Sequence, residues 1–133
     1  MSTTSHQTRR AIRREPPPLK PRPLPLRLIG FLIFILVFLR ELISANLSLA
    51  NAALFVKKSD FDPGFFLYPL ENLSEFEILL LTHTITLTPG TTSVMVDEEA
   101  EALIVHAFDA HDEDELVQGI HSSLERAILG FTR

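Results

Sequence analysis

The sequence predicts an α+β protein: one membrane-embedded or interfacial helix, followed by a small two-layer β-α-β-β-α domain of the split βαβ-like type. Three observations support this prediction. Residues 28–39 are an unbroken apolar run, residues 59–133 alternate between strand-like and helix-like patterns, and the charges are segregated along the chain. Residues 1–27 hold seven Lys or Arg and one acid, whereas residues 59–133 hold fifteen acids and two arginines. This segregation is more typical of a membrane protein than of a nucleic-acid-binding protein.

The first segment, residues 1–27, contains six prolines. Such a density is expected to exclude helix and strand and to favour an extended chain. We therefore predict a basic, proline-rich, disordered arm, which is either a solvated tail or an electrostatic contact with anionic lipid. The whole chain has 133 residues and no cysteine, which allows one modest domain and excludes disulfides, thiolate metal sites and a cysteine nucleophile.

The second segment, residues 28–58, is predicted to be an apolar membrane helix. Its first twelve residues would form a helix of only ~18 Å, against a hydrocarbon core of ~30 Å, whereas residues 28–56 would reach ~43 Å. A spanning helix and an in-plane or tilted helix therefore both remain open. Lys57 and Lys58 make the exit of the segment basic like its entry, which favours the in-plane arrangement on the cytoplasmic face.

Two adjacent charges, Arg40 and Glu41, interrupt the apolar segment. Ionisable residues within an apolar helix are candidates for function because an unpaired charge is costly in the bilayer. Neighbouring residues on a helix point about 100° apart, so this pair is not expected to neutralise itself easily. The alternative is that both side chains lie at the interface and reach water.

The third segment, residues 59–133, is predicted to be an acidic αβ domain. Residues 65–68 suggest a short strand, and Ser74 with Glu77 forms a capping-box signature at the start of a helix from Glu75 to about Leu87. This helix is apolar nearly all round and is therefore expected to be buried. Its threonine-rich second half leaves its end uncertain.

A turn and a hairpin follow. The residues Thr88, Pro89, Gly90 and Thr91 fit a type II turn, with proline at the second position and glycine at the third, where φ is positive. Residues 92–96 and 102–108 are rich in β-forming residues and are predicted to pair through the acidic joint 97–101.

The last element is an amphipathic helix that Asp112 and Glu115 are expected to cap. Its apolar face contains residues at helical spacing: Leu116, Ile120, Leu124, Ala127 and Phe131. His121 and Glu125, four residues apart on this helix, are interpreted as a surface pair.

The sequence contains no arrangement that predicts catalysis, a metal site or a cofactor. The spacing of His106 and His111 matches no compact metal-ligand pattern, and the acids at 109–115 are expected to be a solvated helix N-terminus. No hydroxyl lies beside a His/Asp arrangement that would activate it. We therefore do not expect an enzyme.

Five segments, in order, resemble the E subunit of the multisubunit Mrp/Mnh-type Na+/H+ antiporter family. They are Arg40–Leu42 with Ala45–Asn46, Pro63–Gly64, Leu79–Ser93, Val105–Asp109 and Leu124–Leu129. The resemblance implies an accessory or assembly subunit of a monovalent cation/proton antiporter, involved in sodium and proton transport, with the other antiporter subunits and membrane lipid as partners. It also implies the plasma membrane of a bacterium, with the C-terminal domain in the cytoplasm, and adds Asn46 to Arg40 and Glu41 as candidate subunit-contact or intramembrane residues.

The sequence departs from this family pattern before residue 28, where members usually carry additional membrane helices. The alternative function is a stand-alone, membrane-tethered αβ adaptor that binds a partner protein through its acidic domain.

Overall fold

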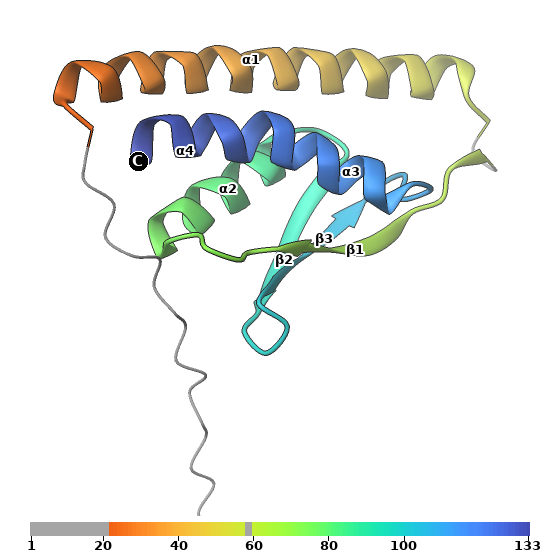
Figure 1. The fold of residues 1–133 in the computed structure, drawn as a ribbon. Coiled ribbons are helices and arrows are strands. Elements are labelled where there is room, and N and C mark those ends of the chain that lie inside the picture. Colours follow the sequence, from red (N-terminus) through yellow and green to blue (C-terminus); the bar gives the residue numbers. More distant parts are fainter. Residues whose placement is uncertain (1–21, 58–59) are drawn as a thin grey trace, which may run out of the picture.

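The structure is a computed structural model that describes residues 22–57 and 60–133; most of the predicted arm, residues 1–21, lies outside the described residues. The elements are arranged in layers (Figure 1). The long helix α1 (Leu24–Phe55) lies on one side, the helices that follow lie beneath it, and a three-stranded sheet lies on the far side of those helices. The predicted α+β class is confirmed.

Helix α1 begins at Leu24, within the proline-rich segment, and not at Leu28. Pro23 is the N-cap and Pro25 lies in the first turn. Proline is tolerated there because first-turn N–H groups have no acceptor within the helix. The expectation that prolines exclude helix up to residue 27 is therefore wrong for residues 24–27. The 32 residues give a helix of about 48 Å, and α1 is the one helix among those described that is long and apolar enough to cross a membrane.

The sheet is antiparallel, with strands in the order β1 (Gly64–Pro69), β3 (Ala102–Ala107) and β2 (Thr91–Asp97). The predicted strand and hairpin are confirmed, with a bulge in β2 between Ser93 and Met95. Because side chains alternate between faces, the register gives the sheet two different faces. The inner face is buried against the helices and includes Phe66, Tyr68, Leu103 and Val105.

Helix α2 (Glu75–Leu87) begins at the predicted capping box. The Ser74 hydroxyl accepts a hydrogen bond from the Glu77 N–H at 3.3 Å, and the Glu77 carboxylate accepts one from the Ser74 N–H at 2.8 Å. Phe76 and Leu79 are more than half exposed, so the expectation that this helix is buried all round is wrong. Only one face of α2 packs into the core, through Ile78, Leu81 and Ile85.

The C-terminal helical segment consists of α3 (Glu113–Ile120), a π-helical turn η2 (His121–Glu125) and α4 (Arg126–Thr132). The predicted cap is confirmed, because the Asp112 carboxylate accepts a hydrogen bond from the Glu115 N–H at 2.9 Å. The π turn was not predicted. In it, the Arg126 N–H donates to the His121 carbonyl, five residues earlier, which rotates α4 relative to α3.

Helix α1 shares the hydrophobic core of the αβ domain. Phe34 of α1 is 5% exposed and belongs to the same buried cluster as Leu124, Ile128 and Phe131 of the C-terminal segment. The apolar helix is therefore packed beside the domain along its first half, and does not simply precede it.

Candidate functional site: a groove between α1 and the C-terminal helices

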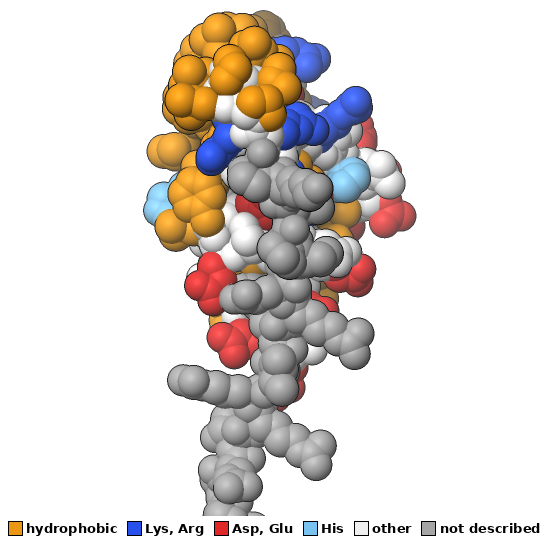
Figure 2. Space-filling view, turned by 60° about the vertical axis from the view of Figure 1, so that its left-hand side comes forward, with side chains coloured by type: hydrophobic (Ala, Val, Ile, Leu, Met, Phe, Trp, Pro, Cys, Tyr) orange, Lys and Arg blue, Asp and Glu red, His pale blue; other side chains and the backbone are white. Residues whose placement is uncertain are grey.

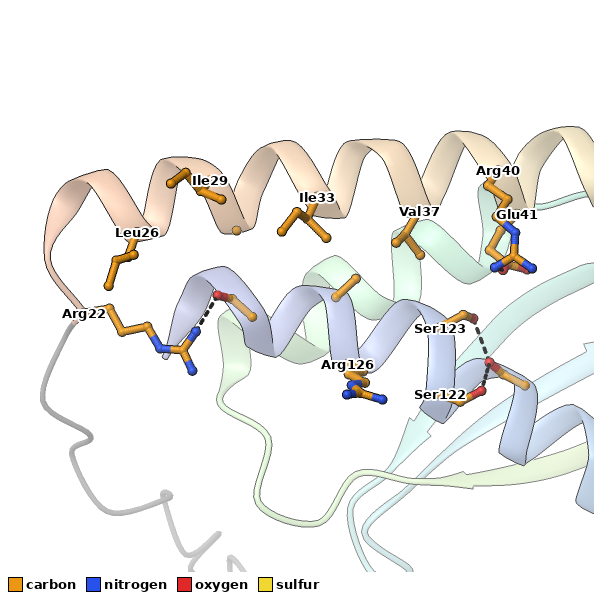
Figure 3. A pocket seen from close by; sticks show the side chains of 14 residues that line it. Arg22, Leu26, Ile29, Ile33, Val37, Arg40, Glu41, Ser122, Ser123 and Arg126 are labelled. Carbon is orange, nitrogen blue, oxygen red and sulfur yellow. Dashed lines mark hydrogen bonds and ion pairs between the residues drawn. The ribbon is translucent and has the colours of Figure 1, made fainter.

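A groove of about 750 Å³ runs between α1 and the α3–η2–α4 segment, and is called the α1 groove below (Figure 3). One wall consists of apolar side chains one or two turns apart on α1: Leu26, Ile29, Ile33 and Val37. The opposite wall consists of small and polar residues of the C-terminal segment, including Gly119, Ser122, Ser123 and Arg126. The groove is therefore amphipathic across its width.

The close approach of α1 and α4 depends on Gly30. A Cβ atom on this residue would lie 2.6 Å from the carbonyl oxygen of Gly130 and 3.0 Å from Cα of Phe131. Two aromatic rings of α1 pack against the residue that follows Gly130, with centroid distances to the Phe131 ring of 5.5 Å for Phe31 and 5.3 Å for Phe34. Backbone contact and ring packing together fix α1 against α4 and set the depth of the groove.

Arg22, just before α1, and Arg27, near the start of α1, bind the end of α4. The Arg22 guanidinium donates to the carbonyl of Gly130 at 3.1 Å, and the Arg27 guanidinium donates to the carbonyl of Phe131 at 3.3 Å. The last carbonyls of a helix have no partner within the helix, and cations are favoured at this end by the helix dipole. These contacts tie the first turn of α1 to the C-terminal end of the domain.

The structure brings Arg40 and Glu41 into the α1 groove, at the end opposite Arg22 (Figure 3). Their charged groups are 3.9 Å apart, so the two side chains do reach one another despite being adjacent. Arg40 is 81% exposed, which makes this a weak, solvated pair. Asn46 does not line the groove; it is exposed and its amide donates to the Leu42 carbonyl at 2.7 Å. A role of these residues in subunit contact stays a prediction.

The turn between α2 and β2 lies away from the groove and closes the end of α2. Gly90 has a φ of 99°, as the expected turn requires. The hydroxyls of Thr88 and Thr91 both donate to the Ile85 carbonyl, at 2.7 and 2.9 Å. These four residues therefore have a structural role in the fold.

Glu125 is a buried carboxylate, so the interpretation of His121 and Glu125 as a surface pair is wrong for Glu125. The Tyr68 hydroxyl donates to it at 2.5 Å, and the His121 ring nitrogen Nδ1 lies 3.1 Å from its other oxygen. Burial, together with the neighbouring carboxylate, raises the pKa of Tyr68 above its ordinary value, so the phenol stays a donor. The π turn positions Glu125 against the sheet. In the sequence, the burial of Glu125 could have been predicted from its position three residues before Ile128, which places both side chains on the same side of the helix.

A second ion pair that the sequence did not predict joins Glu77 of α2 to Arg133. The guanidinium donates to both carboxylate oxygens, at 3.0 and 2.9 Å, and the Thr132 hydroxyl donates to one of them at 2.6 Å. Burial alone would raise the pKa of Glu77, but the hydrogen bonds from Arg133, Thr132 and Ser74 outweigh it and lower the pKa to about 2. The same residue thus caps α2 and holds the C-terminal end of α4.

A second exposed apolar surface is the outer face of the sheet, here called the outer sheet face. Phe65 and Leu67 of β1 are 62% and 55% exposed, and Met95 of β2 is 57% exposed. The register places Leu67 and Met95 on either side of Ile104, and Phe65 beside His106, whose ring is 5.0 Å away. Large apolar side chains in adjacent rows on a solvent-facing sheet are typical of a protein contact surface.

The fold and its surfaces define a class of protein: a small α+β domain fixed to a long, largely exposed apolar helix. A family model described as MNHE, Na+/H+ ion antiporter subunit, matches residues 4–130. The chain belongs to this family of Na+/H+ ion antiporter subunits, and the resemblance found in the sequence is confirmed.

Individual relatives agree with this assignment. The chain is 36% identical over 92 residues to the E1 subunit of the Na(+)/H(+) antiporter of Staphylococcus haemolyticus, covering 69% of this chain and 57% of the relative. It is 33% identical over 107 residues to the E subunit of the Na(+)/H(+) antiporter of Bacillus subtilis, covering 80% and 67%. The chain therefore spans between about half and two thirds of the length of these curated relatives.

A solved structure is similar as well. A chain in the structure of the Mrp complex from Dietzia sp. DQ12-45-1b aligns with a TM-score of 0.56 and 31% sequence identity. The alignment covers 82% of this chain and 98% of that chain.

Proposed function

We propose that this chain is a non-catalytic accessory or assembly subunit of a multisubunit Na+/H+ antiporter in a bacterial plasma membrane. The observation that carries the proposal is the match, in both sequence and shape, to nearly the whole of one chain of the Mrp complex. The partners are then the other subunits of the antiporter and the membrane lipid around them.

Two apolar surfaces of the chain support a role within a larger assembly. The first is α1, whose solvent-facing side carries exposed leucine, isoleucine and phenylalanine along most of its length. Figure 2 shows apolar side chains gathered on α1, Lys and Arg next to them, and Asp and Glu farther from the helix. The second is the outer sheet face, which lies on the opposite side of the helical layer. Large apolar patches on a small domain are stable in water only when a partner or lipid covers them.

For the orientation, we propose that α1 lies in the plane of the membrane interface with the acidic domain on its cytoplasmic side. The domain packs beside the first half of α1, from Leu26 to Glu41, and shares its core. If α1 crossed the bilayer upright, the carboxylates of the domain would be carried toward the hydrocarbon, where each charge is costly. An in-plane helix instead places its exposed apolar side in lipid, its arginines at the headgroups and the acids in water.

The test of the subunit proposal is co-purification. The full chain is tagged and co-expressed with the other antiporter subunits in cells that lack their own sodium/proton antiporters, and sodium tolerance is scored in parallel. We expect the subunits to co-purify, and Leu67→Asp on the outer sheet face to reduce recovery while the chain remains in the membrane. The matched control is Glu99→Asn on the exposed hairpin loop, which should change neither readout. Normal sodium tolerance without this chain, and no co-purification, would favour the adaptor function instead.

The same experiment tests the role of the Arg40–Glu41 pair in assembly. Arg40→Ala and Glu41→Ala are expected to weaken assembly without changing ion selectivity, because an accessory subunit has no conduction path of its own. The control is Lys57→Ala, which removes one charge from the same segment outside the α1 groove. Normal assembly with altered transport would assign the pair to the ion pathway and contradict the accessory function.

The orientation is tested by labelling. The sequence has no cysteine, so a single cysteine introduced at Glu99 reports the location of the acidic domain without background. We expect an impermeant maleimide to label it only after the cells are opened. Labelling in intact cells would show that the domain is outside and that α1 crosses the membrane.

A further inference from the structure

The α1 groove has a charge that is unusual for this domain. Its polar residues include three arginines, Arg22, Arg40 and Arg126, and one carboxylate, Glu41. Residues 60–125, by contrast, contain fifteen acids and no Lys or Arg. The basic character therefore belongs to the groove and its neighbourhood, and not to the domain as a whole.

Among residues 22–57 and 60–133, Arg126 has no partner: its side chain makes no hydrogen bond or ion pair, and it is exposed to the groove. Within the same residues, Arg22 donates from one nitrogen to the Gly130 carbonyl, and its other donors have no partner. Guanidinium groups in this state are suited to bind phosphate oxygens, because their donors match the geometry of the anion.

The apolar wall that α1 contributes to the groove offers no hydrogen-bond donor to a free anion. Leu26, Ile29, Ile33 and Val37 present only hydrocarbon, and the wall continues onto the exposed apolar side of α1. A purely apolar ligand would leave the arginines facing hydrocarbon, and a free phosphate would leave the apolar wall in water. A ligand that satisfies both walls carries an acyl chain and a phosphate with no cation beside it, because the groove holds three arginines and one carboxylate.

We propose that the α1 groove binds an anionic phospholipid, with its phosphate at Arg126 and a neighbouring arginine and its acyl chain along the apolar wall of α1. The volume of about 750 Å³ is within the range of small-ligand pockets, about 300–1,000 Å³. The inference rests on the membrane position of α1 proposed above. It does not require the antiporter complex, because both walls of the groove come from this chain.

The experiment is native mass spectrometry of the full chain released from neutral detergent micelles. Phosphatidylglycerol and phosphatidylcholine with identical acyl chains are the two probes. We expect phosphatidylglycerol to bind more tightly, and Arg126→Gln to weaken its binding about fivefold, as expected for one cation at a lipid phosphate. The matched control is Lys57→Gln, which removes one charge from the end of α1 outside the groove and should leave binding unchanged. Inorganic phosphate is not expected to displace the lipid.

A steric variant tests the groove without changing charge. A Cβ atom on Gly119 would meet nothing within 4 Å, so Gly119→Leu is expected to fold normally and to fill the groove. It should abolish the preference for phosphatidylglycerol, whereas Gly119→Ala should retain it. Equal binding of both lipids, or an unchanged preference in both Arg126→Gln and Gly119→Leu, would overturn the proposal. If Gly119→Leu keeps its lipid but no longer co-purifies with the other subunits, the groove holds a protein segment instead and the lipid assignment is wrong.

Discussion

The docking of α1 on the domain depends on the contact at Gly30, and replacing this residue by alanine should separate the two. The added Cβ atom would lie 2.6 Å from a backbone oxygen of Gly130. A backbone atom cannot rotate away as a side chain can, so α1 must move outward or α4 must bend. Overpacking of this kind costs about 1–3 kcal/mol.

The matched variant is Gly119→Ala. Both glycines are in helices, and both substitutions gain about 1 kcal/mol of helix propensity. At Gly119, however, the new atom meets nothing within 4 Å. The propensity gain therefore cancels in the comparison, and Gly30→Ala should be less stable than Gly119→Ala by about 1–3 kcal/mol, the cost of overpacking alone.

The assay is urea unfolding of the full chain in mild detergent, with amide hydrogen exchange measured on the same samples. In Gly30→Ala, the amides of α4 should exchange faster than in Gly119→Ala, because α1 no longer covers them. If the two variants are equally stable and exchange alike, α1 does not approach α4 at Gly30, and the geometry of the α1 groove is refuted.

Three further outcomes are expected from unfolding measurements on the full chain. The pKa of Glu77 is about 2 in the folded chain, below its ordinary value of 4.5. The ionised carboxylate therefore contributes about 3 kcal/mol to the free energy of unfolding above pH 4.5, and this contribution should decline as the pH falls toward 2. Glu77→Gln should flatten this decline. Tyr68→Phe removes the donor to the buried Glu125 carboxylate and should destabilise the fold by about 1–3 kcal/mol, with a loss near zero indicating that the carboxylate is solvated. Gly90 has a φ of 99°, so Gly90→Val should cost about 1 kcal/mol or more, and unchanged unfolding would show that the turn relaxes to another type.

Local sequence signals determined the elements of the domain. The capping box at Ser74 and Glu77, the cap at Asp112 and the positive φ at Gly90 each depend on residues a few positions apart, and each is found where the sequence predicted it. Runs of β-forming residues predicted the strands for the same reason, since the preference for a strand is a property of neighbouring residues. The family was also readable from the sequence, because five ordered segments match it.

The contacts between residues far apart in the chain could not be predicted from the sequence. The Glu77–Arg133 pair and the Tyr68–Glu125 pair each join residues more than fifty positions apart, and no periodicity encodes such a contact. The π turn has no local sequence signature either.

The packing of α1 against the domain was likewise decided only by tertiary structure. The apolar run predicted a helix suited to lipid, but it did not indicate whether that helix packs against the domain. That depends on Gly30 of α1 meeting Gly130 of α4, two glycines that are one hundred residues apart in sequence. Each glycine alone appears only as a weak point in a helix. Their contact exists only once α2, the sheet and the π turn have set the position of α4, and it is this contact that creates the α1 groove.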